Sequence, residues 1–263
     1  MAKWLTTFAR GKDFQEAKRI LEEAGIKMEV ISPEPGYRQV AQPALVVDDN
    51  GRSFLEEERE KAAQAGWVEY RPTNLSVPDT APEVFAEDIF GQAAIVLLAP
   101  CVADETKIRL IAHLTGNISV ALPYLNAVRE NASYIKNGPV LTLMEGYRFI
   151  SLQPLRISIA RADDIIDGWR LLEKIRVEIN RVWQKRNQIQ PSEVLRQRPP
   201  ALEILKRLPR LNCQACGEKT CIAFAWKVYQ GTAKVTECRP VFNGEYSHLK
   251  EALLEICRGL GTL

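Results

Sequence analysis

Four cysteines that fall within 26 residues constrain this chain more than any other feature of its sequence. Cys213, Cys216, Cys221 and Cys238 follow the spacing C-x2-C-x4-C-x16-C, and residues 1–100 contain no cysteine. Cysteines scattered through a hydrophobic core would not gather in this way. The first three can lie on one compact loop while the fourth returns from a distance, and four thiolates are the ligand set of a cubane iron–sulfur cluster. The spacing therefore predicts a metal centre held by these four residues.

The residues around the cysteines fit such a centre. Gly217 directly follows the second cysteine, where it allows a sharp turn and exposes backbone N–H groups that can donate to sulfur. Cys221 is expected in the first turn of a helix over residues 222–230, where the helix dipole favours the thiolate. We expect the aromatic residues of that helix to shield one side of the site from water: Phe224, Trp226 and Tyr229.

Three other interpretations of the four cysteines compete with a cluster. Structural zinc is the strongest of them, because four-cysteine zinc sites are common. Zinc ribbons usually show two short C-x2-C pairs, however, and here the last two cysteines are separated by sixteen residues. Two disulfides would conflict with a reducing compartment, and four unrelated core cysteines is the weakest interpretation. Spacing alone favours iron–sulfur and leaves zinc open.

A family resemblance enters at these residues. The segment from Leu208 to Pro240 resembles the four-cysteine [4Fe-4S] domain of the large subunit of the corrinoid iron–sulfur protein and of the B subunit of the Rnf electron-transport complex. It departs from the family pattern at Leu211, where threonine is usual, and at Arg239, which separates Cys238 from the proline. Neither departure removes a ligand. The pattern is matched at Pro209, Asn212, Cys213, Cys216, Gly217, Thr220, Cys221, Phe224, Ala225 and Cys238.

The resemblance implies an electron-transfer protein that binds one [4Fe-4S] cluster through Cys213, Cys216, Cys221 and Cys238. It implies a redox partner protein, with a corrinoid protein as the candidate, and a carrier or accessory role in anaerobic metabolism rather than an enzyme. The basic residues near the motif add an acidic electron donor as a second candidate partner. The alternative is a non-redox module in which the metal site, cluster or zinc, is structural and the N-terminal domain binds a partner. An enzyme with its site in residues 83–162 is a further alternative, although no acid–base or nucleophile set is evident there.

Composition excludes several classes of protein. The 263 residues are 46% hydrophobic and 26% charged, which is ordinary for a globular protein and rules out a largely disordered or coiled-coil chain. A net charge of +2 gives no reason to expect nucleic acid as the main partner. The longest nearly apolar run, residues 93–103, is shorter than the roughly 20 residues of a spanning helix. With no apolar signal segment before Arg10, we expect a cytoplasmic protein.

Hydrophobic periodicity predicts an α+β fold in three parts. Residues 1–72 read as a ferredoxin-like split β-α-β unit, in which the name refers to backbone topology only. A polar linker over 73–82 leads to a mixed α+β middle domain, residues 83–187, with a hairpin and a long helix opened by Asp163 and Asp164. A second linker over 188–200 precedes a small helical cluster domain, residues 201–263. Among the individual elements we expect helices over 56–65 and 107–114.

Residues outside the cysteine motif give weaker signals. Between Ile175 and Arg210, nine basic residues face three acidic ones, and this charge could ease reduction of a nearby cluster or dock an acidic partner. A solvated helix face followed by a basic linker explains the same residues. Cys101 ends an apolar strand and Cys257 lies among leucines of the last helix, so both are expected to pack in the core. Whether either has a redox role is left open by the sequence.

Overall fold

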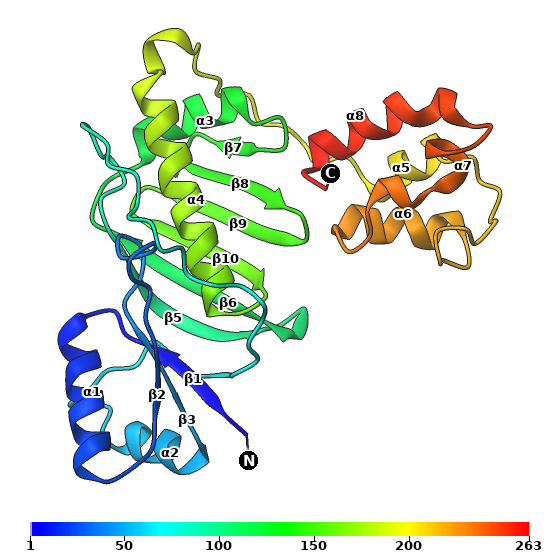
Figure 1. The fold of residues 1–263 in the computed structure, drawn as a ribbon. Helices are drawn as coiled ribbons and strands as arrows, with labels where there is room; N and C mark the ends of the chain where they lie inside the picture. Colours follow the sequence, from blue (N-terminus) through cyan, green and yellow to red (C-terminus); the bar gives the residue numbers. More distant parts are fainter. Residues whose placement is uncertain (1, 263) are drawn as a thin grey trace. The chain divides into compact units, whose positions relative to one another are not determined.

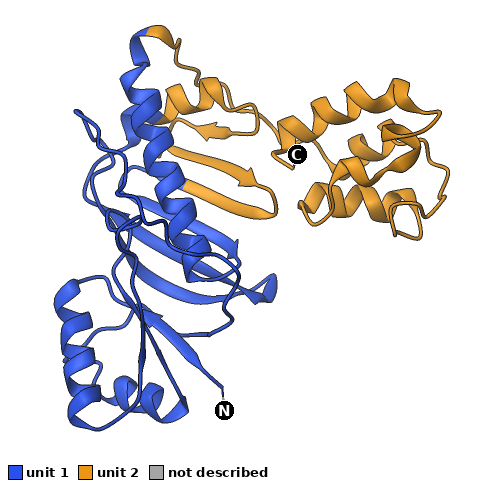
Figure 2. Cartoon of the chain, viewed as in Figure 1, with its two compact units in different colours: residues 1–121, 152–187 blue, residues 122–151, 188–263 orange. Residues whose placement is uncertain are grey.

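The computed structural model describes residues 2–262 as an α+β protein with two antiparallel sheets and eight α-helices (Figure 1). The chain divides into two compact units (Figure 2). Residues 1–121 and 152–187 form unit 1, and residues 122–151 and 188–263 form unit 2. The α+β class predicted from the sequence is confirmed.

The first sheet lies at the N-terminal end of unit 1. Its elements are β1 (Trp4–Thr7), α1 (Gly11–Glu23), β2 (Glu29–Ile31), β3 (Ala44–Val47), α2 (Asp49–Glu57) and β4 (Val68–Glu69). The strand order is β2-β3-β1-β4, and every pair is antiparallel, with Trp4 opposite Val47 and Thr7 opposite Ala44. Both β-α-β connections are therefore split by an inserted strand. Phe14 and Leu21 of α1 and Leu55 of α2 are buried in one core with β3, so the two helices share a face of the sheet.

The predicted helix over 56–65 is wrong, because α2 ends at Glu57 and residues 58–65 are not helical. α2 starts directly after Asp48, whose side chain accepts a hydrogen bond from the Gly51 N–H at 2.9 Å. Aspartate is favoured both at turns and at helix N-caps. Asp48 therefore suits the N-cap position that it occupies.

The second sheet has six strands: β5 (Ala93–Cys101), β6 (Asp104–Leu114), β7 (Ser133–Ile135), β8 (Val140–Glu145), β9 (Arg148–Gln153) and β10 (Arg156–Ala162). Their order in the sheet is β5-β6-β10-β9-β8-β7. β6 pairs antiparallel with β5 on one side and with β10 on the other, which makes it an interior strand.

The predicted helix over 107–114 is wrong, because these residues belong to β6. Ile108, Leu110, Ala112 and Leu114 are buried while Arg109 and His113 are exposed, which is the two-residue alternation of a strand. The apolar residues of this segment also match a helical spacing, so periodicity alone did not distinguish a strand from a helix. At the start of β6, the Asp104 side chain accepts the Thr106 N–H at 3.0 Å.

The long helix predicted after Asp163 and Asp164 is confirmed as α4 (Ile165–Gln184). The Asp164 carboxylate accepts the Asp167 N–H at 2.8 Å and so caps the first turn. Trp169 and Ile179 are fully buried on its apolar face. Among residues 2–262, no helix is both long and apolar enough to cross a bilayer.

The helices of unit 2 are α3 (Leu122–Val128), α5 (Ala201–Arg207), α6 (Cys221–Gln230), α7 (Arg239–Phe242) and α8 (Lys250–Leu260). Short 3-10 turns lie at Ser119–Ala121, Arg186–Gln188, Val235–Glu237 and Ser247–Leu249. Ile204 of α5, Phe224 and Val228 of α6, and Leu253 and Leu260 of α8 are buried in one core. The helical character predicted for this region is confirmed, and its core places α6 beside the cysteines.

Candidate metal centre

The four predicted ligands meet at one place in unit 2. Cys213, Cys216, Cys221 and Cys238 all line the same small hollow, which is bordered by Phe224 of α6. Cys213 is exposed, Cys216 and Cys221 are half-buried, and Cys238 is buried. Within residues 2–262, no three His, Cys, Asp or Glu side chains are grouped as ligands of a metal ion. The four cysteines therefore border one hollow, although their side chains are not yet grouped as the ligands of a metal ion among these residues.

The loop that carries the first two cysteines has an unusual backbone. Arg210, Asn212 and Gln214 have φ angles of 56°, 50° and 60°, and Gly217 has 84°. Left-handed φ is uncommon for residues other than glycine and is found at functional sites. Where left-handed and ordinary residues alternate, successive N–H groups converge into a concave nest that binds anions and iron–sulfur centres. The loop therefore has the backbone expected of a shell around a negatively charged group.

Asn212 ties this loop to the start of α6. Its side-chain Oδ1 accepts the Cys221 N–H at 2.8 Å, and its own N–H donates to Cys221 Sγ at 3.4 Å. The sequence analysis matched Asn212 to the family pattern without assigning it a role. Asparagine also tolerates the left-handed conformation better than most residues. Asn212 therefore suits both the backbone turn of the loop and the hydrogen bond to Cys221.

Cys221 lies in the first turn of α6, as predicted. Thr220 is the N-cap and its Oγ1 accepts the Ala223 N–H at 3.2 Å. The dipole of the helix places a partial positive charge at its N-terminus, beside the side chain of this residue. Gly231 ends the helix in a left-handed conformation, with φ of 73°.

Cys238 reaches the hollow from the far end of the motif, between the 3-10 turn Val235–Glu237 and α7. Burial raises the pKa of its thiol, the Val241 backbone opposes the shift, and the charges of Cys216, Cys221 and Cys213 raise it further. That electrostatic influence reflects how close the four side chains are. Bound iron would reverse the effect, because a coordinated thiol is deprotonated.

The predicted aromatic shield is only partly correct. Phe224 is buried and borders the hollow, but the Trp226 side chain is 54% exposed. Trp226 instead stacks on Tyr229, with the ring centroids 5.5 Å apart. Because α6 is apolar on nearly all sides, its sequence did not show which aromatic residue faces the core.

The other two cysteines are buried in their units. Cys257 of α8 is fully buried in the unit 2 core, and burial raises the pKa of its thiol to about 11. Cys101 ends β5 and is 4% exposed. The core packing predicted for both is confirmed.

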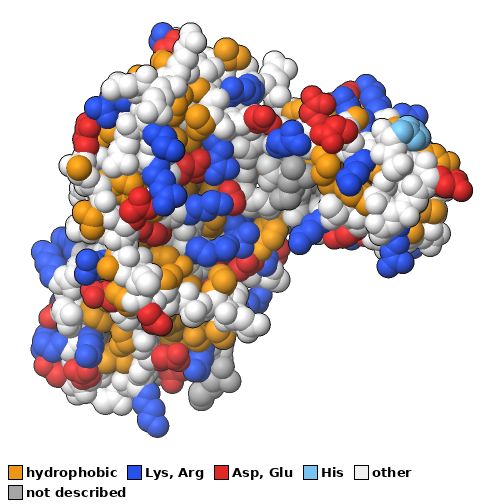
Figure 3. All heavy atoms as spheres, turned by 45° about the horizontal axis from the view of Figure 1, so that its top comes forward, with side chains coloured by type: hydrophobic (Ala, Val, Ile, Leu, Met, Phe, Trp, Pro, Cys, Tyr) orange, Lys and Arg blue, Asp and Glu red, His pale blue; other side chains and the backbone are white. Residues whose placement is uncertain are grey.

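The basic stretch 175–210 is largely engaged in internal contacts. Arg176 is buried and binds Glu173 at 2.8 Å and Asp88 at 3.2 Å. Further along, Lys206 and Arg207 both pair with Glu203. Figure 3 shows basic and acidic side chains interspersed over the visible surface of both units. These contacts leave little of the stretch available as a separate docking surface.

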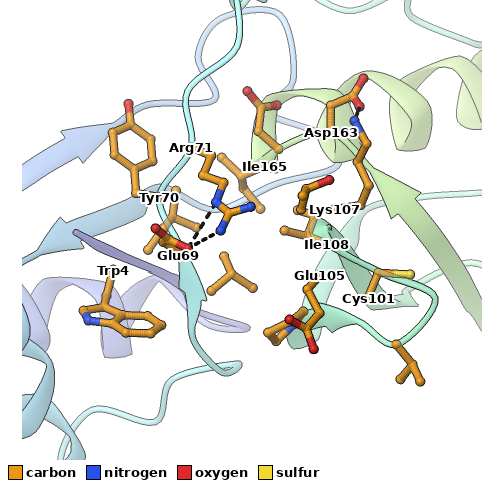
Figure 4. A pocket seen from close by; sticks show the side chains of 16 residues that line it. Trp4, Glu69, Tyr70, Arg71, Cys101, Glu105, Lys107, Ile108, Asp163 and Ile165 are labelled. Atoms are coloured by element: carbon orange, nitrogen blue, oxygen red, sulfur yellow. Dashed lines mark hydrogen bonds and ion pairs between the residues drawn. The ribbon is translucent and has the colours of Figure 1, made fainter. Parts of the chain in front are cut away.

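Unit 1 contains a cavity of about 480 Å³, which is within the range of ligand pockets. Trp4, Cys101 and Ile165 contribute to its apolar lining. Its two basic residues are paired inside it, Arg71 with Glu69 and Lys107 with Asp163 (Figure 4). The sequence analysis named no residue of this cavity as a site residue, because its lining comes from four separate segments.

Comparison with known proteins supports the C-terminal assignment. A family model described as "Putative Fe-S cluster" matches residues 208–240. The acetyl-CoA decarbonylase/synthase complex subunit gamma 2 of Methanosarcina thermophila is 44% identical over 54 residues, 20% of this chain and 12% of that protein. The gamma subunit of Methanosarcina acetivorans is 48% identical over 40 residues, which are 15% of this chain and 8% of that protein. The gamma subunit of Methanocaldococcus jannaschii is 32% identical over 56 residues, which are 21% of this chain and 12% of that protein.

The similarity to these relatives covers 40 to 56 residues of the chain. This chain covers about a tenth of the length of the relatives that it matches. Residues 208–240 therefore form an iron–sulfur cluster segment similar to that of the gamma subunits. Four soft thiolates, a concave loop backbone and a helix N-terminus suit such a cluster. The comparisons say nothing of the remaining parts of the chain.

Proposed function

We propose that the chain is an electron-transfer protein that holds one [4Fe-4S] cluster through Cys213, Cys216, Cys221 and Cys238. The observation that carries the proposal is the convergence of these four residues on one hollow. A loop with left-handed residues and the first turn of α6 surround that hollow. A single zinc ion would need the four sulfurs at about 2.3 Å from one point. A backbone N–H that donates to a cysteine sulfur, and a loop with several left-handed residues, favour a larger anionic group.

Each part of the site has a distinct task in this proposal. The bound cluster supplies a centre that gains or loses one electron. The four thiolates hold it, and backbone N–H groups of the loop donate to sulfur and so make reduction easier. Phe224 keeps water from the buried side, whereas Cys213 is exposed and provides the edge at which an electron can enter or leave.

A protein partner is part of the proposal. The relatives are named as subunits of an acetyl-CoA decarbonylase/synthase complex, so we propose that this chain also acts with another redox protein. The family resemblance gives a corrinoid protein as a candidate, and the basic residues near the motif give an acidic electron donor. A carrier role rather than catalysis, and a reducing cytoplasmic location that keeps the thiols available for iron, complete the proposal.

Anaerobic purification with iron and sulfide analysis tests the proposal. We expect a brown protein with about four irons and four sulfides per chain, whose absorption bleaches with dithionite and whose reduced form gives an EPR signal. Replacing any one of the four cysteines by alanine should diminish or destabilise the cluster. Cys101→Ala is the matched control and should leave iron content unchanged. Unchanged iron in Cys238→Ala would contradict the ligand assignment.

The alternative of a structural metal site makes a different prediction. Stoichiometric zinc in protein produced anaerobically with ample iron, or a cluster that cannot be reduced, would favour it over electron transfer. Colourless protein after attempted cluster assembly in vitro would end the iron–sulfur proposal altogether.

Ligand binding in unit 1 is a second candidate function, which the cavity of Figure 4 favours. The carboxylates in its lining outnumber the basic residues by two: Glu69, Glu105, Asp163 and Asp164 against Arg71 and Lys107. Tryptamine and indole-3-propionate, which share an aromatic body and differ in charge, are suitable probes. Calorimetric binding of tryptamine alone, lost in Asp164→Asn, would support this candidate. Binding of neither probe would count against it.

A further inference from the structure

Exposed apolar side chains gather beside Cys213. Leu211, Ile222 and Trp226 are 46%, 61% and 54% exposed, which is unusual for large apolar residues. The two hydrogen bonds between Asn212 and Cys221 hold the loop next to Leu211 against the first turn of α6. Ile222 and Trp226 are four residues apart on that helix and therefore share a face. The three side chains thus form an apolar surface next to the most exposed of the proposed ligands.

Trp226 is held in a fixed position at one end of this surface. Its indole stacks on the Tyr229 ring at an interplanar angle of 26°. The Arg198 guanidinium lies 4.0 Å from the centroid of the same tyrosine and also donates to the Tyr229 carbonyl. A tryptophan that is already ordered loses little conformational entropy on binding, and tryptophan is among the residues that dominate binding energy at interfaces.

Basic residues flank the apolar surface. Arg210, Lys219 and Arg239 are exposed, and each lies within three residues of a proposed ligand in the sequence. Within residues 2–262 none of the three has a carboxylate partner, whereas neighbouring Lys227 is paired with Glu218. Glu218 and Glu237 lie in the same stretch, so the charge around the cysteines is positive but partly balanced within the chain.

We infer that this surface is the docking site of an acidic redox protein, an inference that rests on the proposed electron-transfer function. We call it the docking face, and it comprises Leu211, Ile222, Trp226, Arg210, Lys219 and Arg239. The apolar centre is an area from which water is displaced when a partner binds. The basic rim attracts and orients a partner that carries carboxylates. Encounters between redox proteins bury small interfaces, so a docking face of a few residues is enough to bind such a partner transiently. The partner is brought to Cys213, the exposed edge of the site.

The test uses the full chain with its reconstituted cluster and, as the probe, an acidic ferredoxin that carries two [4Fe-4S] clusters. Binding is measured by calorimetry at low and at high ionic strength, and electron transfer by stopped-flow absorbance. Ile222→Ser with Trp226→Ser removes the apolar centre, and Lys219→Glu with Arg239→Glu reverses the rim. Val84→Ser and Lys12→Glu are matched controls, because both residues are exposed in unit 1. Direct reduction by dithionite reports whether the cluster itself is intact.

We expect each docking-face double variant to bind the ferredoxin about tenfold more weakly or worse, because interface hot spots carry energies of that size. Binding by the unchanged chain should weaken with ionic strength, since the Debye length shortens. Dithionite should reduce all variants alike. Variants that bind like the unchanged chain would overturn the inference, as would equal binding of basic cytochrome c or of a single-stranded oligonucleotide. A cluster that dithionite cannot reduce would instead overturn the proposed function, and the inference with it.

Discussion

Asn212 and Cys221 are joined by two hydrogen bonds that run in opposite directions between the cysteine loop and α6. The Cys221 N–H donates to the asparagine side chain, and the Asn212 N–H donates to the cysteine sulfur. The first bond satisfies an N–H group at the helix start that has no partner within the helix. The second brings a backbone donor of the loop against the sulfur of a proposed ligand. One pair thus couples the shape of the loop to the chemistry of a proposed ligand.

Replacing Asn212 separates these contributions. Asn212→Ala loses the side-chain bond and also places alanine at a φ of 50°, whereas Asn212→Gly loses the bond without the left-handed strain. We expect alanine to lower the free energy of unfolding by about 2–3 kcal/mol and glycine by about 1 kcal/mol. Thermal unfolding and the rate of iron loss to a chelator measure both. Equal effects of the two variants would show that strain at this position is unimportant.

Gly231 makes a close backbone approach at the end of α6. A Cβ atom there would lie 2.4 Å from the Gly146 carbonyl oxygen, in addition to the cost of a φ of 73°. Gly138 has the same φ but no atom within 4 Å of its Cβ position, so it serves as the matched control. We expect Gly138→Ala to cost about 1 kcal/mol and Gly231→Ala clearly more. Denaturant unfolding of the two variants tests this, and similar losses would contradict the close approach.

Arg176 anchors the segment before β5 to α4. Its guanidinium is 1% exposed, binds Glu173 and Asp88, and donates to the Glu83 carbonyl at 2.7 Å. Arg176→Ala leaves two carboxylates without their partner, and we expect a loss of about 3–5 kcal/mol. Arg176→Lys should restore little, because an ammonium cannot form the same planar pairs. The basic residue is therefore expected to affect stability, measured by denaturant unfolding, and not the affinity for an acidic partner.

Much of the fold could be predicted because most elements carry one clear periodicity. α4 has a cap at Asp164 and a helical apolar face, and these two features were sufficient to predict it as a long helix. The segment 107–114 failed because its apolar residues satisfy helical and strand spacing at once, and only pairing with β5 and β10 decides between them. Pairing depends on residues distant in the sequence, which no local pattern contains.

The sequence predicted which cysteines would form a site, but not the surroundings of these cysteines. The cysteine spacing named four residues that the structure brings to one hollow, because three of them are close in the chain. The exposure of Trp226 was missed, since an all-apolar helix does not reveal which face meets the core. The unit 1 cavity was missed because residues from four segments build it. Spacing in the chain predicts local geometry, and burial depends on packing.

Cys257 should make the stability of the chain depend on pH at alkaline values. Its thiol is fully buried, and burial raises its pKa from about 9 to about 11. The folded chain therefore holds a proton that the unfolded chain releases between these values, so stability falls as the pH rises from about 9 to about 11. A shift of this size corresponds to roughly 2–3 kcal/mol. The contribution is fully present below pH 9.

Cys257→Ala isolates this effect from the titration of other groups. The alanine variant cannot ionise at this position, so the difference in unfolding free energy between the two chains should change by up to the same roughly 2–3 kcal/mol across that pH range. Denaturant unfolding at closely spaced pH values measures the difference, with Cys101→Ala as a second comparison. The unchanged chain should also resist alkylation of Cys257 until it unfolds, because the thiolate is the reactive form. A difference that is constant with pH would mean that the Cys257 thiol ionises as readily in the folded chain as in water.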